Sequence, residues 1–166
     1  MLVTVMMHVI SGVPWVPSRK RTIALMLNMA ELKPGQRVYD LGCGDARLLI
    51  RAEKQYGIYG IGYENAPLAL LAAFLNKWIH RSKVEIRVKN LMNADLKNAD
   101  RILAYLGPEL NKKLIPKFKK ECKPGTLIIS NTFRMHDLTP LHEIPKSREQ
   151  KTNSVYVYKI PSRKTR

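Results

Sequence analysis

The sequence has 166 residues, 45% of them hydrophobic, which suffices for one packed core and is too short for two domains of ordinary size. Its formal net charge of +16 favours acidic partners such as nucleic acid, an anionic membrane face or an acidic protein, although a solubilising surface would have the same composition. Two cysteines without a CxxC pair and four histidines without HExxH spacing exclude the common zinc and redox motifs, so we expect no metal site. We therefore expect a single domain over residues 1–166.

The N-terminal region divides into two parts. Residues 1–12, "MLVTVMMHVISG", hold an apolar run that is far shorter than the ~20 residues of a membrane-spanning helix, and they lack the features of a secretory signal. We expect a cytoplasmic protein. The run is a buried first segment, which we favour, a surface-lying membrane anchor, or the remnant of a longer membrane segment. Residues 13–35 form a pre-sheet segment: "VPWVPS" comes first, and a helix with apolar residues at i, i+3, i+4 and i+7 follows, from Ile23 to Ala30.

Strands and helices then alternate along the chain. The apolar runs predict strands over residues 37–41, 58–64, 84–88, 101–106 and 125–130. Helices are predicted over 46–56, from Pro67 onward with Leu68, Leu71, Ala72 and Leu75 on one apolar face, and in the lysine-rich stretch before residue 124, where Pro116 predicts a kink or a restart. Two late strands, 141–144 and 154–160, have no helix between them, and a basic tail, 161–166, follows.

This order predicts an α/β fold: a Rossmann-like, doubly wound, mostly parallel sheet with an antiparallel C-terminal strand pair. In such sheets the ligand binds at the carboxyl ends of the strands, where the strand order reverses. The site is therefore expected near the residues that follow Leu41, Tyr63, Val88 and Leu106.

The segment "VYDLGCGDA" carries the clearest chemical signal. Gly42 and Gly44 follow the first strand directly and allow a ligand to approach the backbone, and Glu64 stands 20 residues beyond Gly44, where a carboxylate can bind ribose hydroxyls. A dinucleotide would need a third glycine where this chain has Arg47. Asp40 repels phosphate and attracts an ammonium group, which favours S-adenosylmethionine, a cofactor without phosphate.

"DLGCGDARLL" and "GIGYE" resemble the first two motifs of class I methyltransferases. The resemblance implies S-adenosylmethionine as cofactor, and it implies an adenine contact from Asn90, which stands where many members have an aspartate. Ala46 replaces a glycine that many members have, which limits how closely the backbone approaches the ligand. The cofactor-binding residues implied are Asp40, Gly42 and Gly44 for the methionyl part, Glu64 for the ribose, and Asn90 and Leu91 for the adenine.

The resemblance narrows further over residues 13–160. "VPWVPS" with the following helix, "NLMNADLKNADRILAYLGPELNKKL" and "KPGTLIISNTF" are similar to a family of small protein-lysine methyltransferases that includes enzymes acting on the ATP synthase c-subunit and on the adenine nucleotide translocase, and broad-specificity archaeal enzymes. For such an enzyme, methyl transfer is an SN2 displacement that depends on orientation and desolvation. Our candidates for the substrate channel are Tyr105 and Trp15, although both residues could serve only in packing.

Rival chemistries lack their residues. After the fourth strand the chain reads Tyr105-Leu106-Gly107-Pro108, without the Asn/Asp-Pro-Pro-Tyr/Phe motif of adenine and glutamine methylation, and Glu109 has no second glutamate beside it for a guanidinium. We expect a monomer that acts on a protein with an accessible lysine, acidic or membrane-associated. An RNA methyltransferase, and an inactive protein that binds the cofactor or an acidic partner, remain alternatives.

Three further features have simpler interpretations. The lysines between residues 112 and 123 could dock an acidic substrate, but a charge run is more often a solvated helix face, which we favour. His136 is expected in a loop, and Asp45 is expected to cap the helix that begins at Ala46.

Overall fold

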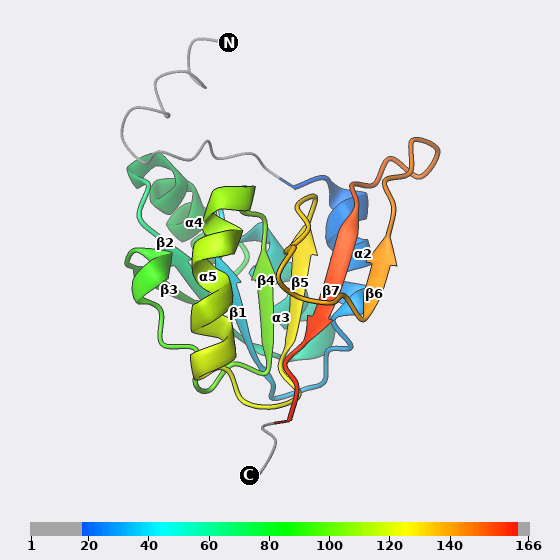
Figure 1. Cartoon of the computed structure of the whole chain (residues 1–166). Coiled ribbons are helices and arrows are strands. Elements are labelled where there is room, and N and C mark those ends of the chain that lie inside the picture. The colour runs from blue at the N-terminus through cyan, green and yellow to red at the C-terminus, as the bar shows by residue number, and fades with distance from the viewer. Residues whose placement is uncertain (1–17, 163–166) are drawn as a thin grey trace.

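The computed structural model describes residues 18–162, and its centre is a seven-stranded sheet (Figure 1). The strand order is β3-β2-β1-β4-β5-β7-β6, with parallel pairing from β3 to β5 and antiparallel pairing on both sides of β7. The order reverses between β1 and β4, which is where such sheets bind their ligands. The strands are β1 (Arg37–Leu41), β2 (Tyr59–Glu64), β3 (Glu85–Val88), β4 (Arg101–Ala104), β5 (Leu127–Asn131), β6 (His142–Ile144) and β7 (Val155–Lys159).

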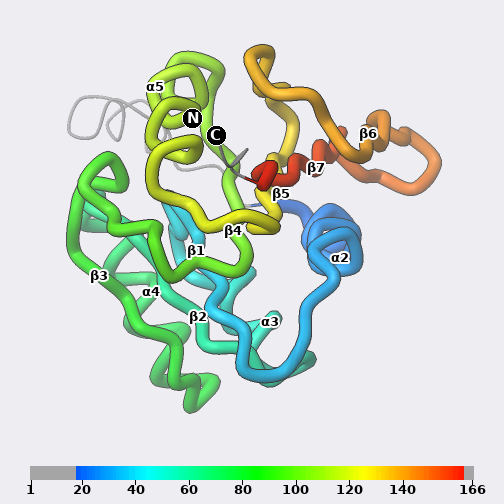
Figure 2. The backbone as a smooth tube through the Cα atoms, turned by 60° about the horizontal axis from the view of Figure 1, so that its bottom comes forward, coloured from blue at the N-terminus to red at the C-terminus, as the bar shows by residue number. Residues whose placement is uncertain are grey.

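Helices cover both faces of the sheet (Figure 2). One apolar core joins residues of α2, α3 and α4 to one side of the sheet, and a second core joins α5 to the other side. Neighbouring strand residues alternate between the cores: Val38 belongs to the first, and Tyr39 to the second. The helices are α2 (Lys20–Met29), α3 (Arg47–Tyr56), α4 (Pro67–Ile79) and α5 (Pro108–Glu121), with a 3₁₀ turn η1 (Leu91–Asn93).

The predicted fold class is confirmed, including the antiparallel pair at the C-terminal end. The last strand of the chain, β7, inserts between β5 and β6, so that β6 forms the edge of the sheet. The predicted restart of the helix at Pro116 is wrong, because α5 runs without a break from Pro108 to Glu121 and contains Pro116. Pro116 and Lys112, four residues earlier, are both exposed, so water can satisfy the carbonyl group that loses its helical partner.

Helix α4 exists as predicted, but its apolar face does not pack on the sheet. The side chains that pack inward are the small Ala69 and Ala73, both fully buried, whereas Leu68, Leu71 and Leu75 are more than half exposed. In α2 and α3 the expected inward residues are indeed buried or half-buried, among them Met26 and Leu49.

Candidate active site

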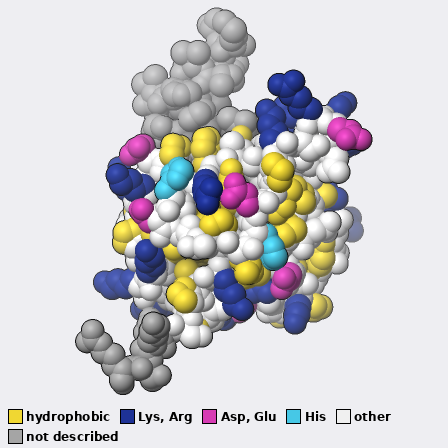
Figure 3. Space-filling view, turned by 45° about the vertical axis from the view of Figure 1, so that its right-hand side comes forward, with side chains coloured by type: hydrophobic (Ala, Val, Ile, Leu, Met, Phe, Trp, Pro, Cys, Tyr) yellow, Lys and Arg dark blue, Asp and Glu magenta, His cyan; other side chains and the backbone are white. Residues whose placement is uncertain are grey.

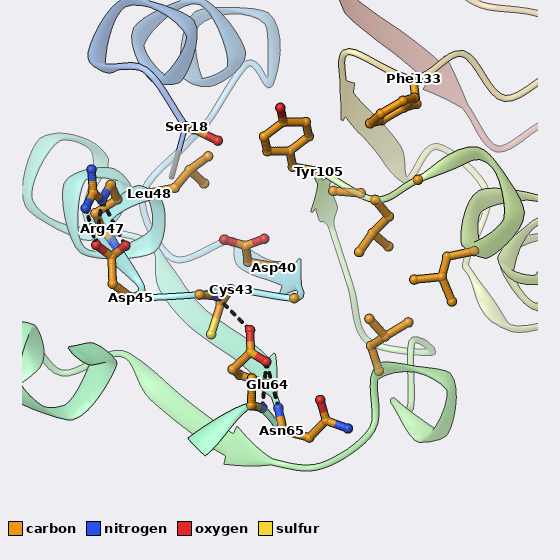
Figure 4. A pocket seen from close by; sticks show the side chains of 18 of the residues that line it. Ser18, Asp40, Cys43, Asp45, Arg47, Leu48, Glu64, Asn65, Tyr105 and Phe133 are labelled. Atoms are coloured by element: carbon orange, nitrogen blue, oxygen red, sulfur yellow. Dashed lines mark hydrogen bonds and ion pairs between the residues drawn. The ribbon is translucent and has the colours of Figure 1, made fainter. Parts of the chain in front are cut away.

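A pocket of about 450 Å³ opens at the carboxyl ends of β1, β2 and β4 (Figure 4). Every described residue that the sequence assigned to the cofactor or to the channel lines it. Trp15 lies outside the described residues. The lining residues from the prediction are Asp40, Gly42, Gly44, Glu64, Asn90, Leu91 and Tyr105. The structure thus brings them together, and their individual roles toward the cofactor stay predictions.

The glycine loop forms the floor of the pocket. The backbone N–H groups of Gly42 and Cys43 both donate to the carbonyl oxygen of Tyr63, at 2.9 and 3.0 Å, which fixes the loop against the end of β2. Gly42 has a φ of 79°, and a Cβ built there would lie 3.2 Å from Cδ2 of Leu106. Only glycine adopts this conformation without strain and keeps the space above the backbone open for a ligand.

Glu64 lies at the end of β2 with its carboxylate held in one orientation. Its Oε2 accepts from the N–H of Gly44 at 3.0 Å, and its Oε1 accepts from the N–H groups of Asn65 and Ala66, both at 2.9 Å. These bonds tie the second strand to the glycine loop. A preorganised carboxylate of this kind costs little further ordering when it accepts ribose hydroxyls.

Asp40 ends up in an apolar, acidic environment that disfavours its charge. It is 6% exposed, and burial, followed by the nearby carboxylates of Glu64 and Asp45, raises its pKa to about 8. A bound cation would stabilise the ionised form and reverse this shift. The site therefore favours a ligand that brings positive charge to the floor of the pocket.

Cys43 has a packing role. Burial, with Asp40 as the next cause, raises the pKa of its thiol far above the usual range, so the thiol stays protonated. Its side chain fills the space beside Gly62, where an added Cβ would lie 2.6 Å from Sγ. Gly62 therefore leaves room for the loop to lie against β2.

The predicted adenine side of the pocket is formed by Asn90 and Leu91, just beyond β3. The Asn90 side chain already accepts a hydrogen bond from the N–H of Met92 at 2.9 Å and thereby caps η1. An amide oxygen can accept a second hydrogen bond, so the expected contact with an adenine amine stays possible in this geometry.

Two aromatic rings form the opposite end of the pocket. Tyr105, half-buried and just beyond β4, stacks on Phe133, with the ring centroids 6.2 Å apart and an angle of 28° between the planes. In Figure 4, Asp40 lies between these rings on one side and Glu64 on the other. Tyr105 is therefore a pocket residue and not a core aromatic.

The sequence did not lead us to predict Phe133 as a pocket residue. The carbonyl of Phe133 accepts from Ser130 Oγ at 2.6 Å, its N–H donates to the carbonyl of Asn131 at 2.8 Å, and Thr132 before it has a φ of 69°. This tight turn after β5 directs the ring into the pocket. The available signal was an aromatic residue just after a strand whose carboxyl end borders the site.

The remaining site predictions have mixed outcomes. Asp45 accepts the N–H of Arg47, the first residue of α3, at 3.3 Å and forms an ion pair with the Arg47 side chain, while the N-cap position itself is Ala46. His136 is an exposed loop residue, as expected. The lysines of α5 lie mostly on an exposed face, and Lys117 pairs with Glu121 at 2.7 Å, which agrees with a solvated helix face.

The sequence from residue 40 to residue 142 matches the family described as the ANTKMT methyltransferase domain, which is more than half of the chain. The chain belongs to this family. It is 29% identical over 161 residues to a protein-lysine N-methyltransferase of Saccharolobus islandicus (strain REY15A), a match that covers 95% of this chain and 100% of that protein. The adenine nucleotide translocase lysine N-methyltransferase of Mus musculus is 26% identical over 151 residues, covering 89% of this chain and 63% of that protein.

Among solved structures, an RNA methyltransferase from Salinibacter ruber in complex with S-adenosyl-L-homocysteine matches with a TM-score of 0.84 and 32% identity, covering 90% of this chain and 97% of that chain. The comparisons confirm the predicted family, fold and enzyme class. The chain is an S-adenosylmethionine-dependent methyltransferase of class I, related to protein-lysine N-methyltransferases. Its pocket suits that cofactor, because the glycine loop lets a ligand approach the backbone and the buried Asp40 carboxyl fits a ligand with positive charges and no phosphate.

Proposed function

We propose that this methyltransferase modifies the ε-amine of a lysine in a protein substrate. The observation that carries the proposal is the aromatic pair of Tyr105 and Phe133, which lies across the pocket from Glu64. The relatives named as lysine methyltransferases support the same acceptor. The excess of basic residues suits an acidic substrate protein.

The residues of the pocket divide into a cofactor half and an acceptor half. Glu64 would hold the ribose and Asp40 would face the positive charges of S-adenosylmethionine, which supplies an electrophilic methyl group on a sulfonium. The lysine nitrogen forms a bond to the methyl carbon while the carbon–sulfur bond breaks, and the electron pair of that bond stays on sulfur. Orientation of these groups by the pocket is the main catalytic contribution.

The aromatic pair prepares the amine. An ammonium group is attracted to the faces of Tyr105 and Phe133, and the partly buried site between the cofactor and the rings removes water from it. Desolvation lowers the pKa of a lysine, so the proton is lost to solvent and the lone pair becomes available. No protein side chain has to act as the base in this scheme.

The test is methyl transfer from tritiated S-adenosylmethionine to a cell extract, divided into protease-treated and nuclease-treated halves. We expect the label to disappear with protease and to be recovered as methyl-lysine after acid hydrolysis. The Glu64→Gln protein lacks the carboxylate that would bind the ribose, and it is the control for transfer that depends on this pocket. Label that resists protease and disappears with nuclease would overturn the proposal.

An RNA acceptor is the second candidate. The Salinibacter ruber structure carries that name, and the net charge of +16 suits a polyanion. On the face that includes the β6–β7 edge, however, Lys and Arg side chains are interspersed with acidic and hydrophobic ones over the described surface (Figure 3). This pattern differs from the basic stripe of nucleic-acid-binding proteins, and the nuclease arm of the experiment distinguishes the two acceptors.

A further inference from the structure

Helix α4 exposes more apolar surface than a solvated helix ordinarily does. The helix has 13 residues, and six large apolar side chains lie exposed on its outer side. Ala69 and Ala73, on the inner side, pack toward the sheet. Contiguous apolar surface of this kind marks an interaction site. The α4 surface consists of Leu68 (54% exposed), Leu71 (68%), Phe74 (46%), Leu75 (53%), Trp78 (77%) and Ile79 (56%).

The charged side chains of the segment that carries the α4 surface have a single sign. Residues 65–84 contain three charged side chains, Lys77, Arg81 and Lys83, all basic. The carboxylates around the segment are already engaged. Glu64 accepts three backbone N–H groups at the pocket, and Glu85 pairs with Arg87. Glu53 of α3 accepts hydrogen bonds from Ser82 Oγ and from the backbone N–H of Lys83. The surface thus combines apolar side chains with positive charge that has no acidic neighbour within the segment.

The two kinds of side chain meet at the C-terminal end of α4. A shallow hollow there is lined by Phe74, Trp78 and Ile79 together with Lys77, Arg81 and Ser82. Tryptophan beside lysine and arginine is the combination found where a protein meets the boundary between lipid headgroups and acyl chains.

We propose that the α4 surface binds an anionic membrane, with its leucines and aromatic rings in the headgroup boundary and its cations on lipid phosphates. No helix within residues 18–162 is long and apolar enough to cross a bilayer, so the contact is interfacial. Helix α4 begins beside the cofactor pocket, which Ala66 lines, and Asn76 donates to the carbonyl of Asp45 in the glycine loop at 3.0 Å. Docking through α4 therefore brings the rim of the active site to the membrane.

A second copy of the chain fits this surface less well. In a two-fold symmetric contact the same patch meets itself, and because residues 65–84 contain no acidic residue, the second patch offers Lys77, Arg81 and Lys83 no carboxylate. Like charges across an interface oppose association, whereas an anionic lipid surface complements them. The proposal does not depend on which acceptor is methylated.

The test measures binding to vesicles of phosphatidylcholine alone and of phosphatidylcholine mixed equally with phosphatidylglycerol. We expect sedimentation with the anionic vesicles only, weakened by added salt because the charge contribution is screened. Leu71→Gln/Trp78→Gln should reduce the affinity roughly 100-fold or more, because each side chain contributes apolar burial at the boundary. Leu141→Gln, at a 51% exposed leucine beside β6, is the matched control and should bind like the wild type.

Charge and insertion are tested separately. Arg81→Gln/Lys83→Gln should weaken binding to anionic vesicles roughly 25-fold, at about fivefold per cation. Lys112→Gln/Lys113→Gln on α5 should have a much smaller effect. The chain has two tryptophans, so in a Trp15→Phe background the fluorescence reports Trp78 alone. Its emission should shift to the blue on binding and be quenched by brominated lipid.

Several results would overturn the proposal. These are no binding to anionic vesicles, equal losses for the α4 and Leu141 variants, or Trp78 emission that vesicles leave unchanged. A concentration-dependent dimer that Leu71→Gln/Trp78→Gln dissociates, without any vesicle binding, would assign the surface to a second copy. Unchanged S-adenosylmethionine affinity and circular dichroism establish that the variants are folded. Vesicle binding is measured without an acceptor, so its failure is distinguishable from failure of the proposed lysine acceptor.

Discussion

Replacement of Asp40 by asparagine should stabilise the protein while weakening cofactor binding. Asp40 is 6% exposed with a pKa raised to about 8, against about 3.9 for an aspartate in an unfolded chain. Between these values the folded state keeps a proton that the unfolded state has released. The contribution of Asp40 to stability therefore falls as pH rises from about 4 to about 8, and it is constant above that.

The magnitude follows from the shift. Each pKa unit corresponds to about 1.4 kcal/mol, so the free energy of unfolding of Asp40→Asn should exceed that of the wild type by an amount that grows about 1.4 kcal/mol per pH unit. About four units of difference give a ceiling on the order of 6 kcal/mol near pH 8. Water entering the pocket solvates the carboxylate and lowers the observed gain.

The assay is urea unfolding of both proteins at several pH values between about 4 and 9, with Asp137→Asn as the control at an exposed loop aspartate. Calorimetric titration with S-adenosylmethionine provides the second arm. Because the bound cation favours ionised Asp40, wild-type binding below about pH 8 should release a proton to the buffer, and the measured binding enthalpy should therefore vary with the ionisation enthalpy of the buffer. The affinity for S-adenosylmethionine should increase as the pH rises. A stability difference that is flat or shrinks with pH, or a cofactor affinity unaffected by the substitution, would refute the reasoning.

Three further predictions concern the pocket and the packing of the glycine loop on β2. Glu64→Gln should weaken S-adenosylmethionine binding roughly 100-fold, measured by calorimetry, because the ribose loses a charged acceptor. Tyr105→Phe should keep most of the methyl transfer. Phe133→Ala should lower kcat/KM for the acceptor about tenfold with the cofactor affinity unchanged, because stacking on Tyr105 and desolvation of the acceptor are lost. An equal loss of cofactor affinity would contradict the acceptor role of the aromatic pair. Gly62→Ala should cost about 1–3 kcal/mol in urea unfolding through its overlap with the Cys43 side chain, and the cost should shrink in a Cys43→Ala background.

The sheet and the cofactor half of the pocket were accessible from the sequence because their signals are local. Each strand is a short apolar run, and the turn at Gly42 and Gly44 needs residues that accept positive φ. Glu64 follows from its place at the end of the next strand, since parallel neighbours bring their carboxyl ends to one edge. These inferences need only the alternation of strands and helices.

The acceptor half depends on contacts between segments distant in sequence. The ring of Phe133 enters the pocket because Thr132 adopts a left-handed conformation, and because Ser130 and Asn131 form hydrogen bonds with the backbone of Phe133. The ring then stacks on Tyr105, which follows another strand. No periodicity records such a turn. Trp15, the other candidate for the channel, lies outside the described residues and stays a prediction.

Helix α4 shows why periodicity alone cannot assign the inward face of an apolar helix. Pro67–Ile79 has apolar residues on all sides, so its pattern does not distinguish a face with leucines from one with alanines. Ala69 and Ala73 face the sheet, and small side chains let the helix backbone approach it closely. Full burial of a leucine, isoleucine or phenylalanine is worth about 1.5–3 kcal/mol, and the isolated chain forgoes roughly half of that at each such position of the α4 surface. A partner that covers this surface recovers part of that free energy, and the basic residues beside it determine that an anionic partner does so best.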